Sequence, residues 1–307
     1  MDSPGGNKSA LRTRYALYAV CDVTQQHQDL LERGINVKAI VCYSGGHSSA
    51  LVAIEAVRKC GRENVILLNH DISPKVERED IKRFKNEVAE YLGMEITYAN
   101  APDFEEMTPL AVSVKKNAFQ VGNGQCFCTH YLKTEPFHTW LAENYPADIN
   151  NINEDVRILY GFDRNEPHRI QRREGVLLLK GYKSDFPLAF WKRTIDNTEE
   201  IGIRIPSTYR IWKHANCQAC LKAGKQHWYC VFCLRPDLWA EGKQAESEIG
   251  YSIIKGSFLE ELEPKFMEMR DKQGICPTEK GKSASFWKRV NDTLPEQISF
   301  MPCDCAI

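Results

Sequence analysis

Six residues near the start of the chain have the composition of an anion-binding turn: Ser44-Gly45-Gly46-His47-Ser48-Ser49. They follow an apolar run over 36–43 and precede a helix-like segment over 49–59. Glycines let backbone N–H groups approach an anion, serine hydroxyls add donors, and a helix N-terminus adds positive potential. We therefore interpret these residues as a nucleotide phosphate-binding loop, with an ordinary tight turn as the alternative. His47 either bonds the phosphate or fills a variable position.

Four cysteines in the last third of the chain have the spacing of metal ligands. Cys217 and Cys220 form one C-x-x-C pair, Cys230 and Cys233 form another, and nine residues separate the pairs. Four thiolates can close a tetrahedral zinc site or hold an iron–sulfur cluster, and the spacing does not choose between them. Two alternatives remain: Cys128 replaces one cysteine of the second pair, or all four are ordinary buried thiols.

Charged residues that follow predicted strands are further candidates for binding phosphate or its metal. Asp71 follows the apolar run 64–69, and Arg164 and Arg169 follow the run 157–161. Between residues 157 and 193 nine Lys and Arg face four Asp and Glu, which favours a phosphate-rich partner; a solvated basic face is the alternative. Lys133, on a predicted helix after Cys128, is either a ligand or a surface lysine.

The elements that must position these residues alternate along the chain. Strands are predicted over 36–43, 64–69, 95–98 and 157–161, and helices over 49–59 and 76–92. The second helix carries Ile81, Phe84, Val88 and Tyr91 at helical spacing. This order predicts an α/β fold with a doubly wound parallel sheet and right-handed crossovers. Ligands of such sheets bind beyond the carboxyl ends of the strands, where the loop and Asp71 fall.

Changes in residue composition divide the chain into three parts. These are an arm with a short helix over 1–35, a nucleotide-binding domain over 36–206, and a cysteine-rich, helical C-terminal module over 207–307. Hydrophobic residues make up 43%, charged residues 26%, and the net charge is −1, as expected for a soluble globular protein. No apolar run approaches the roughly 20 residues that span a bilayer. Residues 1–10 hold no apolar secretion signal, so we expect a cytoplasmic protein without membrane contact, whose twelve cysteines serve metal or redox chemistry.

The loop resembles the PP-loop of the ATP pyrophosphatase and phosphoadenylyl-sulfate (PAPS) reductase superfamily, whose common pattern is Ser-Gly-Gly-x-Asp-Ser. Three later blocks are also similar to family segments, and the resemblance runs from about residue 37 to residue 254. The blocks are Cys128-Thr129-x-x-Leu132-Lys133-x-x-Pro136, Gly161-x-x-Arg164-x-Glu166-x-x-Arg169, and Cys217-x-x-Cys220-Leu-Lys-x-Gly-Lys with Trp228-Tyr229 and Pro236. The last block looks like that of PAPS-reductase-like proteins common in phages and mobile elements, and other relatives act on phosphorothioate DNA and in tRNA thiolation.

The resemblance implies an adenine nucleotide α-hydrolase-like fold and a sulfur-transferring enzyme. ATP or a related adenine nucleotide would bind at residues 44–49 and near Asp71, with Mg²⁺ on its phosphates, and Cys128, Lys133, Arg164 and Arg169 would serve the chemistry. The four later cysteines would hold a [4Fe-4S] cluster or, alternatively, zinc. The expected reaction is ATP-dependent adenylylation and thiolation of a nucleic acid or nucleotide, with a sulfur-donor protein as partner.

One position departs from the family pattern: Ser48 stands where the family usually has Asp. Backbone N–H groups can bind phosphate without that carboxylate, whereas ATP cleavage or metal binding depends on it more directly. Two alternatives therefore stay open. The chain is a sulfonucleotide reductase of the PAPS type, or it is a catalytically silent nucleotide-binding module of a phage or defence complex.

Overall fold

The structure is a computed structural model, and it describes residues 37–120, 125–215 and 217–293. The predicted arm over 1–35 lies outside the described residues. The chain divides into two compact units: the first takes residues up to 108 and 128–209, and the second takes 109–127 and the residues from 210 onward. Residues 109–127, which the sequence pattern groups with the nucleotide-binding domain, thus belong to the second unit.

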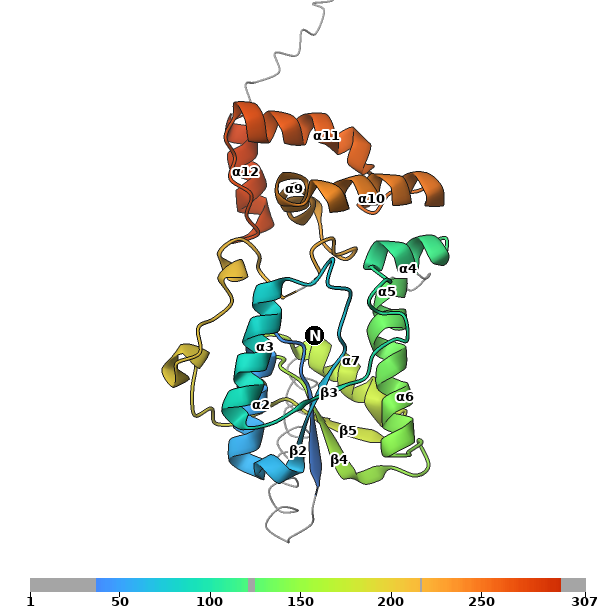
Figure 1. The fold of residues 1–307 in the computed structure, drawn as a ribbon, viewed down its shortest axis with the longest axis vertical. Helices are drawn as coiled ribbons and strands as arrows, with labels where there is room; N and C mark the ends of the chain where they lie inside the picture. The colour runs from blue at the N-terminus through green and yellow to red at the C-terminus, as the bar shows by residue number, and fades with distance from the viewer. Residues whose placement is uncertain (1–36, 121–124, 216, 294–307) are drawn as a thin grey trace, which may run out of the picture. The chain divides into compact units, whose positions relative to one another are not determined.

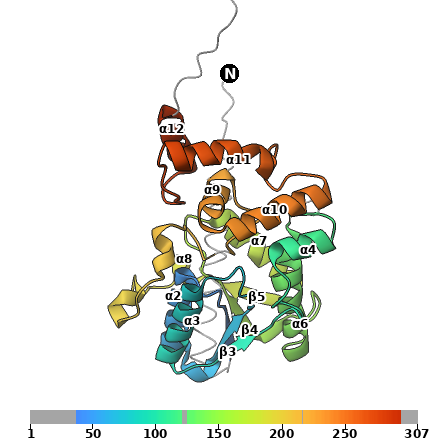
Figure 2. The same cartoon turned by 45° about the horizontal axis from the view of Figure 1, so that its top comes forward.

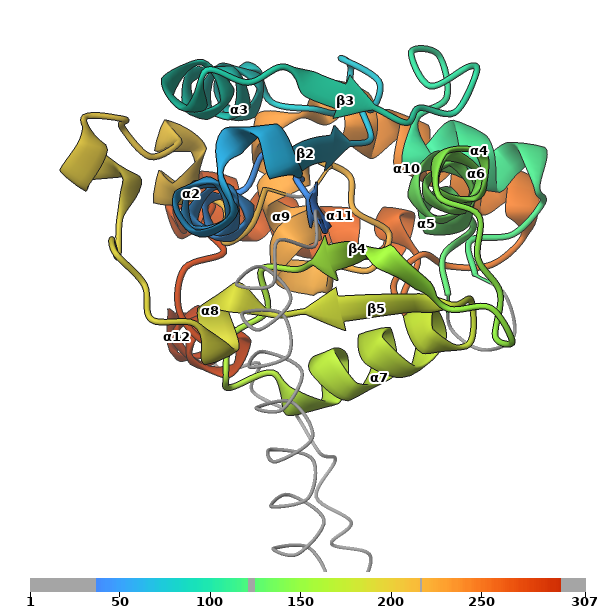
Figure 3. The ribbon, with the colours of Figure 1, turned by 90° about the horizontal axis from the view of Figure 1, so that it is seen from below.

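The first unit is built on a five-stranded sheet whose strands are all parallel. The strands are β1 (Lys38–Cys42), β2 (Val65–Asn69), β3 (Ile96–Tyr98), β4 (Asn153–Leu159) and β5 (Tyr182–Asp185). Their order is β3-β2-β1-β4-β5, so the chain winds outward from β1 in one direction and then continues from β4 in the other (Figure 3). The α/β class predicted from the sequence is confirmed.

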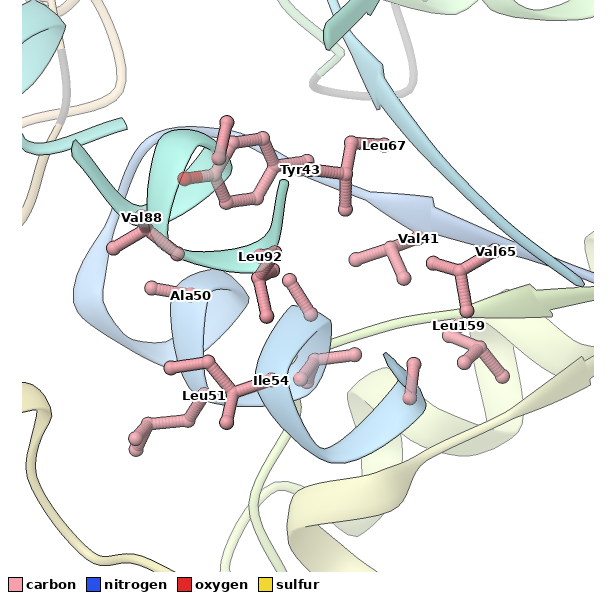
Figure 4. Packing of buried hydrophobic residues seen from close by; sticks show 14 of the residues in the cluster. Val41, Tyr43, Ala50, Leu51, Ile54, Val65, Leu67, Val88, Leu92 and Leu159 are labelled. Carbon is pink, nitrogen blue, oxygen red and sulfur yellow. The ribbon is translucent and has the colours of Figure 1, made fainter. Parts of the chain in front are cut away.

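Helices cover both faces of this sheet (Figure 1). One face carries α2 (His47–Cys60) and α3 (Glu79–Leu92), and the other carries α6 (Glu135–Asn144) and α7 (Pro167–Leu178). Alternate residues of β1 enter the two cores, because successive side chains of a strand point to opposite faces. Val41 packs with α2 and α3, whereas Ile40 packs with Phe137 and Leu177 from α6 and α7. Figure 4 shows the first of these clusters, with Val41 and Tyr43 among the side chains of both helices.

Short helical segments complete the first unit. These are the 3₁₀ turns Arg62–Asn64, Thr198–Ile201 and Ser207–Arg210, α5 (Phe127–Thr129), the π-helical turn His130–Thr134 and α8 (Pro187–Phe190). The last 3₁₀ turn and α5 each cross a boundary between the units.

The second unit is helical, and its core is aromatic. Its helices are α4 (Pro109–Lys115), α9 (Lys225–Leu234), α10 (Pro236–Ile249), α11 (Leu259–Met267), followed by the π-helical turn Glu268–Lys272, and α12 (Ser283–Thr293) (Figure 2). The Trp239 ring from α10 lies 5.1 Å from that of Phe232 and 5.6 Å from that of Phe266, between centroids.

No helix in the described ranges is both long and apolar enough to cross a bilayer.

Helix α3 begins later than predicted and presents a slightly different face to the core. Residues 73–78 form turns, and Arg78 is extended at the N-cap, so the helix starts at Glu79. Ile81, Phe84 and Val88 are buried as predicted, but Tyr91 is 47% exposed and Leu92 is buried in its place. The predicted apolar stripe was therefore wrong at its last position.

Because Phe84 is buried and Tyr91 is exposed, we expect alanine substitutions at these two positions of α3 to lower the free energy of unfolding by different amounts. Phe84→Ala should lower the free energy of unfolding by about 3–5 kcal/mol, because it leaves a cavity between the helix and the sheet. Tyr91→Ala on the exposed face should cost less than about 1 kcal/mol. Urea denaturation of both variants measures the difference, and similar losses would contradict the described orientation of α3.

Candidate phosphate-binding site

The Ser-Gly-Gly turn joins the end of β1 to the start of α2. Gly45 has φ 75°, Gly46 is extended at the N-cap, and α2 begins at His47 and runs for 14 residues. The Ser49 hydroxyl donates to the Gly46 carbonyl at 2.8 Å and lies 3.2 Å from the Ser44 hydroxyl. The first-turn N–H groups of a helix have no carbonyl partners within it, and this first turn has no acidic residue. The turn therefore has the local features of an anion site.

Neighbouring segments pack closely against this turn. A β-carbon on Gly45 would lie 3.2 Å from Cγ2 of Ile81 and 3.3 Å from Lys85, and the positive φ also disfavours any other residue. A β-carbon on Gly161, just after β4, would lie 3.1 Å from the carbonyl of Ser48. The turn is thus held between α3 and the segment that follows β4. Because β1 and β4 are the strands at which the winding direction changes, it lies at the switch point of the sheet.

A buried lysine beneath the turn forms an ion-pair cluster with residues around the end of β2. Lys85 is 2% exposed, and its Nζ lies 3.0 Å from an Asp71 carboxylate oxygen and 3.6 Å from one of Glu77. The same Nζ lies 3.4 Å from Oδ1 of Asn69, whose amide donates to the Tyr43 carbonyl at 2.5 Å. The Tyr43 hydroxyl donates to the Lys85 carbonyl at 2.7 Å. This cluster therefore connects the ends of β1 and β2 to α3.

The two carboxyl groups of the cluster respond differently to their surroundings. Burial acts to raise the pKa of Asp71, but the hydrogen bond and charge of Lys85 outweigh it and hold that pKa below its usual value. Glu77 is more deeply buried, and burial together with the charge of Asp71 leaves its pKa raised despite Lys85. Asp71 is thus ionised but already paired with a cation, which leaves it poorly suited to be the main ligand of a metal.

Residues 197–209, which we name the strap, contact the first turn of α2 from a distant part of the sequence. The backbone N–H of His47 donates to the Tyr209 hydroxyl at 3.1 Å, and Nε2 of its ring accepts the Thr198 N–H at 3.5 Å. Burial lowers the pKa of His47. Close to Tyr209 in the strap, Ser207 donates hydrogen bonds from its N–H and its hydroxyl to the Asp80 carboxylate of α3. The His47 ring therefore faces the strap.

The other predicted phosphate-binding residues lie at the same edge of the sheet but bind other partners. Arg164 donates from Nε to the Ala189 carbonyl, and Arg169 pairs with Glu166 while its guanidinium lies 4.2 Å from the centre of the Phe162 ring. Burial lowers the pKa of His70, just after β2, the bond to the Ala99 carbonyl opposes this effect, and the charge of Lys133 adds to it. Within the described residues no hydrogen bond or ion pair joins these three cations to Ser44–Ser49.

Four of the nine basic residues between 157 and 193, Arg169 with Glu166 among them, form ion pairs with nearby carboxylates. Arg157 is buried and pairs with Glu154, which also binds Lys183, and Arg193 lies 3.6 Å from Asp196. Among the residues that the structure describes, the cations of this stretch without an ion pair are Arg164, Arg172, Arg173, Lys180 and Lys192. The charge available to an anionic partner is therefore smaller than the sequence count indicates.

The predicted metal ligands do not converge. Cys230 and Cys233 lie on α9, and Cys230 is completely buried; Cys217 and Cys220 lie in the irregular chain before that helix and are partly exposed. Throughout the described ranges, no three His, Cys, Asp or Glu side chains are placed to hold a metal ion. Instead, Nε2 of His227 accepts the Cys220 N–H at 3.1 Å and Nδ1 lies 2.5 Å from Glu279. The metal centre predicted from the cysteine spacing therefore stays a prediction, and we derive no chemical step through it.

Cys128, the remaining candidate for catalysis, belongs to the first unit. It is partly exposed in α5 and precedes the π-helical turn that carries Lys133. Two other thiols of this unit are poorly suited to react: burial raises the pKa of Cys42 to about 12 and that of Cys60 to about 11. The thiolate is the reactive form, so neither is suited to act as a nucleophile at neutral pH.

Lys85 and Tyr209 are the site residues that sequence reasoning missed. A signal for Lys85 is present, because the residue lies within the apolar stripe of α3, between Phe84 and Val88, where a lysine requires a buried partner. Tyr209 carries no comparable signal, since 162 positions separate it from His47.

Comparisons with known proteins add no family assignment. Neither the search against protein-family models nor the search of curated proteins found a match to this chain.

Removing the lysine from the buried cluster should strongly lower the stability of the protein. Lys85→Met should lower the free energy of unfolding by about 3–5 kcal/mol at pH 7, because it removes the buried cation that pairs with Asp71 and Glu77 and leaves only the more exposed Lys82 near Glu77. Lys82→Met is a matched control on the same helix, since Lys82 is more exposed and lies 3.6 Å from Glu77; it should cost about 1 kcal/mol or less.

The loss in free energy of unfolding caused by Lys85→Met should also become smaller as the pH is lowered. Without the lysine, both carboxyl pKa values rise above their unfolded values, so protonation favours the folded variant as the pH falls. In the wild type, the depressed pKa of Asp71 changes the free energy of unfolding in the opposite direction. Its stabilising contribution is present at neutral pH and is lost as the pH falls through the folded-state pKa. Urea denaturation at pH 7 and about pH 5 tests this, and a constant deficit would contradict it.

Proposed function

We propose that the chain is a PP-loop enzyme of the adenine nucleotide α-hydrolase-like class. It would bind ATP or a related adenine nucleotide through residues 44–49 and carry out sulfur chemistry. The observation that carries the proposal is the passage from β1 through Ser44-Gly45-Gly46 into α2 at the switch point of a parallel sheet. The strand order fits a doubly wound fold, and the three family-like blocks later in the chain support the same assignment.

The proposed reaction begins with attack of a substrate oxygen on the α-phosphorus of ATP. Pyrophosphate leaves, an adenylylated intermediate forms, and a sulfur nucleophile from a donor then displaces AMP, which yields the thiolated product. The backbone N–H groups of the first turn of α2 would bind the pyrophosphate portion. Lys133 would stabilise charge on the phosphates, and Arg164 and Arg169 would do so after exchanging their present partners for the substrate. Mg²⁺, when bound, would neutralise phosphate oxygens.

The acceptor of sulfur is a nucleic acid or nucleotide in this proposal. Its support is the set of cations at 164, 172 and 173, which form no ion pair within the described residues; Arg164 follows β4, and the other two lie on α7. A sulfur-donor protein would complete the reaction, and Cys128 is a partly exposed thiol that belongs to the same unit as the loop.

A catalytically silent nucleotide-binding module is the second candidate, and Ser48 favours it. Ser48 is exposed on the first turn of α2 and supplies a hydroxyl where the family pattern has a carboxylate. Since Asp71 is neutralised by Lys85, it does not replace that carboxylate as a metal ligand. Tight ATP binding without release of AMP and pyrophosphate would support the silent module, whereas their release in equal amounts would exclude it.

Substitution at Gly45 tests the loop assignment. Gly45→Asp should weaken ATP and pyrophosphate binding about 100-fold or more, because a carboxylate repels the phosphates and the strained turn misplaces two or more N–H donors. Gly93→Asp is the matched control: Gly93 also has a positive φ, 61°, but lies at the C-cap of α3 and has Arg62 as its nearest neighbour. Calorimetric titration measures both variants, and unchanged affinity of Gly45→Asp would refute the site.

The cysteine block is tested by metal analysis. We expect iron in protein purified without oxygen, with broad visible absorption that is lost in Cys217→Ser/Cys220→Ser. Binding would require these cysteines to move toward Cys230 and Cys233. Colourless protein with one zinc would replace the cluster by a structural zinc site, and protein without metal would contradict both.

A further inference from the structure

The strap introduces a hydroxyl group at the start of α2, where the loop would bind phosphate. The oxygen of Tyr209 accepts the His47 N–H at 3.1 Å, and this N–H belongs to the first turn of α2, whose donors have no carbonyl within the helix. A phenolic hydroxyl is both an acceptor and a donor. Among residues 37–120, 125–215 and 217–293, no group accepts the hydrogen of the Tyr209 hydroxyl, so this hydrogen is available to a ligand as far as the described residues are concerned.

Other contacts fix this hydroxyl in place. Thr198, in the same strap, donates its N–H to the His47 ring, and Ser207 is bound to Asp80 on α3. Arg83, which pairs with Asp80 at 2.7 Å, also donates to the Arg204 carbonyl at 3.2 Å. The strap is thus tied to both α2 and α3, and Tyr209 is partly buried.

We propose that Tyr209 is a phosphate-binding residue of the loop: its hydroxyl accepts the His47 N–H and donates its own hydrogen to an oxygen of the bound pyrophosphate group. This inference rests on the proposed function, because it assigns a further ligand to the same nucleotide site. The N–H of His47 polarises the hydroxyl and makes it a stronger donor, since hydrogen bonds in a chain strengthen one another. A bond of this kind to a charged oxygen is among the stronger ones in proteins.

The protonation state of the tyrosine agrees with a donor role. Burial raises the pKa of Tyr209, and the His47 N–H and the positive charge of Arg78 only partly offset this effect. The hydroxyl therefore keeps its hydrogen at neutral pH. The opposite role would be that of a competitor, in which the hydroxyl oxygen occupies the position of a phosphate oxygen and must leave before phosphate binds. The two roles predict effects of opposite sign.

Tyr209→Phe separates them. As a donor, Tyr209 contributes one hydrogen bond to a charged group, so its loss should weaken binding of inorganic pyrophosphate about 10-fold in calorimetric titration. Tyr182→Phe is the matched control: its hydroxyl donates to the Tyr145 carbonyl, a contact away from the loop, and its loss should leave the affinity unchanged. Tighter binding by Tyr209→Phe would identify a competitor and overturn the proposal, and unchanged binding would overturn it as well.

A further variant distinguishes phosphate binding from a merely structural role. Asp80→Ala removes the anchor of Ser207 but leaves the Tyr209 hydroxyl, so it should weaken pyrophosphate binding less than Tyr209→Phe does. An equal or larger loss would mean that the strap as a whole, and not the hydroxyl, supports the site. Urea denaturation of each variant establishes that the protein tested is folded.

The same titrations separate this inference from the proposed function. If wild-type protein binds pyrophosphate and Gly45→Asp does not, the loop assignment holds, and Tyr209→Phe then decides the role of the hydroxyl alone. If wild-type protein binds no pyrophosphate, the proposed function fails and the inference fails with it.

Discussion

The close approach of α3 to Gly45 is the constraint on which the ligand edge of the sheet depends. A β-carbon at this position would lie 3.2 Å from Ile81 and 3.3 Å from Lys85, and the positive φ of Gly45 also disfavours other residues, so glycine is the residue that fits best between the turn and the helix. The same contact brings Lys85 beneath the turn, where it reaches Asp71 and Asn69 at the end of β2. The shape of the candidate phosphate site therefore follows from helix packing as much as from the Ser-Gly-Gly sequence.

The ion-pair cluster around Lys85 loses solvation free energy on burial but fixes the geometry of the elements around the turn. Each buried charge loses solvation, which the pairing must offset, and such a network often stabilises no more than apolar side chains of the same volume would. Its evident effect is on geometry, because Tyr43, Asn69 and Lys85 exchange hydrogen bonds that fix β1, β2 and α3 relative to one another. A turn that must hold several N–H groups toward one anion benefits from this rigidity.

Local patterns in the sequence predicted the strands and helices around the loop with small errors at their ends. The runs 36–43 and 64–69 are apolar, as strands covered on both faces require, and they became β1 and β2. β5 was missed because Tyr182-Lys183-Ser184-Asp185 has only one large apolar residue; its pairing with β4 and the burial of Tyr182, Ser184 and Asp185 are tertiary effects. The Cys-x-x-Cys spacing, in contrast, described a possible ligand set, but spacing does not determine how the four thiols are oriented.

The position of Tyr209 has a consequence for the order in which the first unit can form. This unit is discontinuous along the chain, because residues 109–127 belong to the other unit, and Tyr209 is its last residue. During synthesis, β1, the loop and α2 emerge early, whereas the hydroxyl that contacts His47 emerges 162 residues later. Contacts between such distant residues form slowly, because a long loop must close before they form. The nascent chain thus lacks the contact between His47 and Tyr209 until nearly the whole unit has been made.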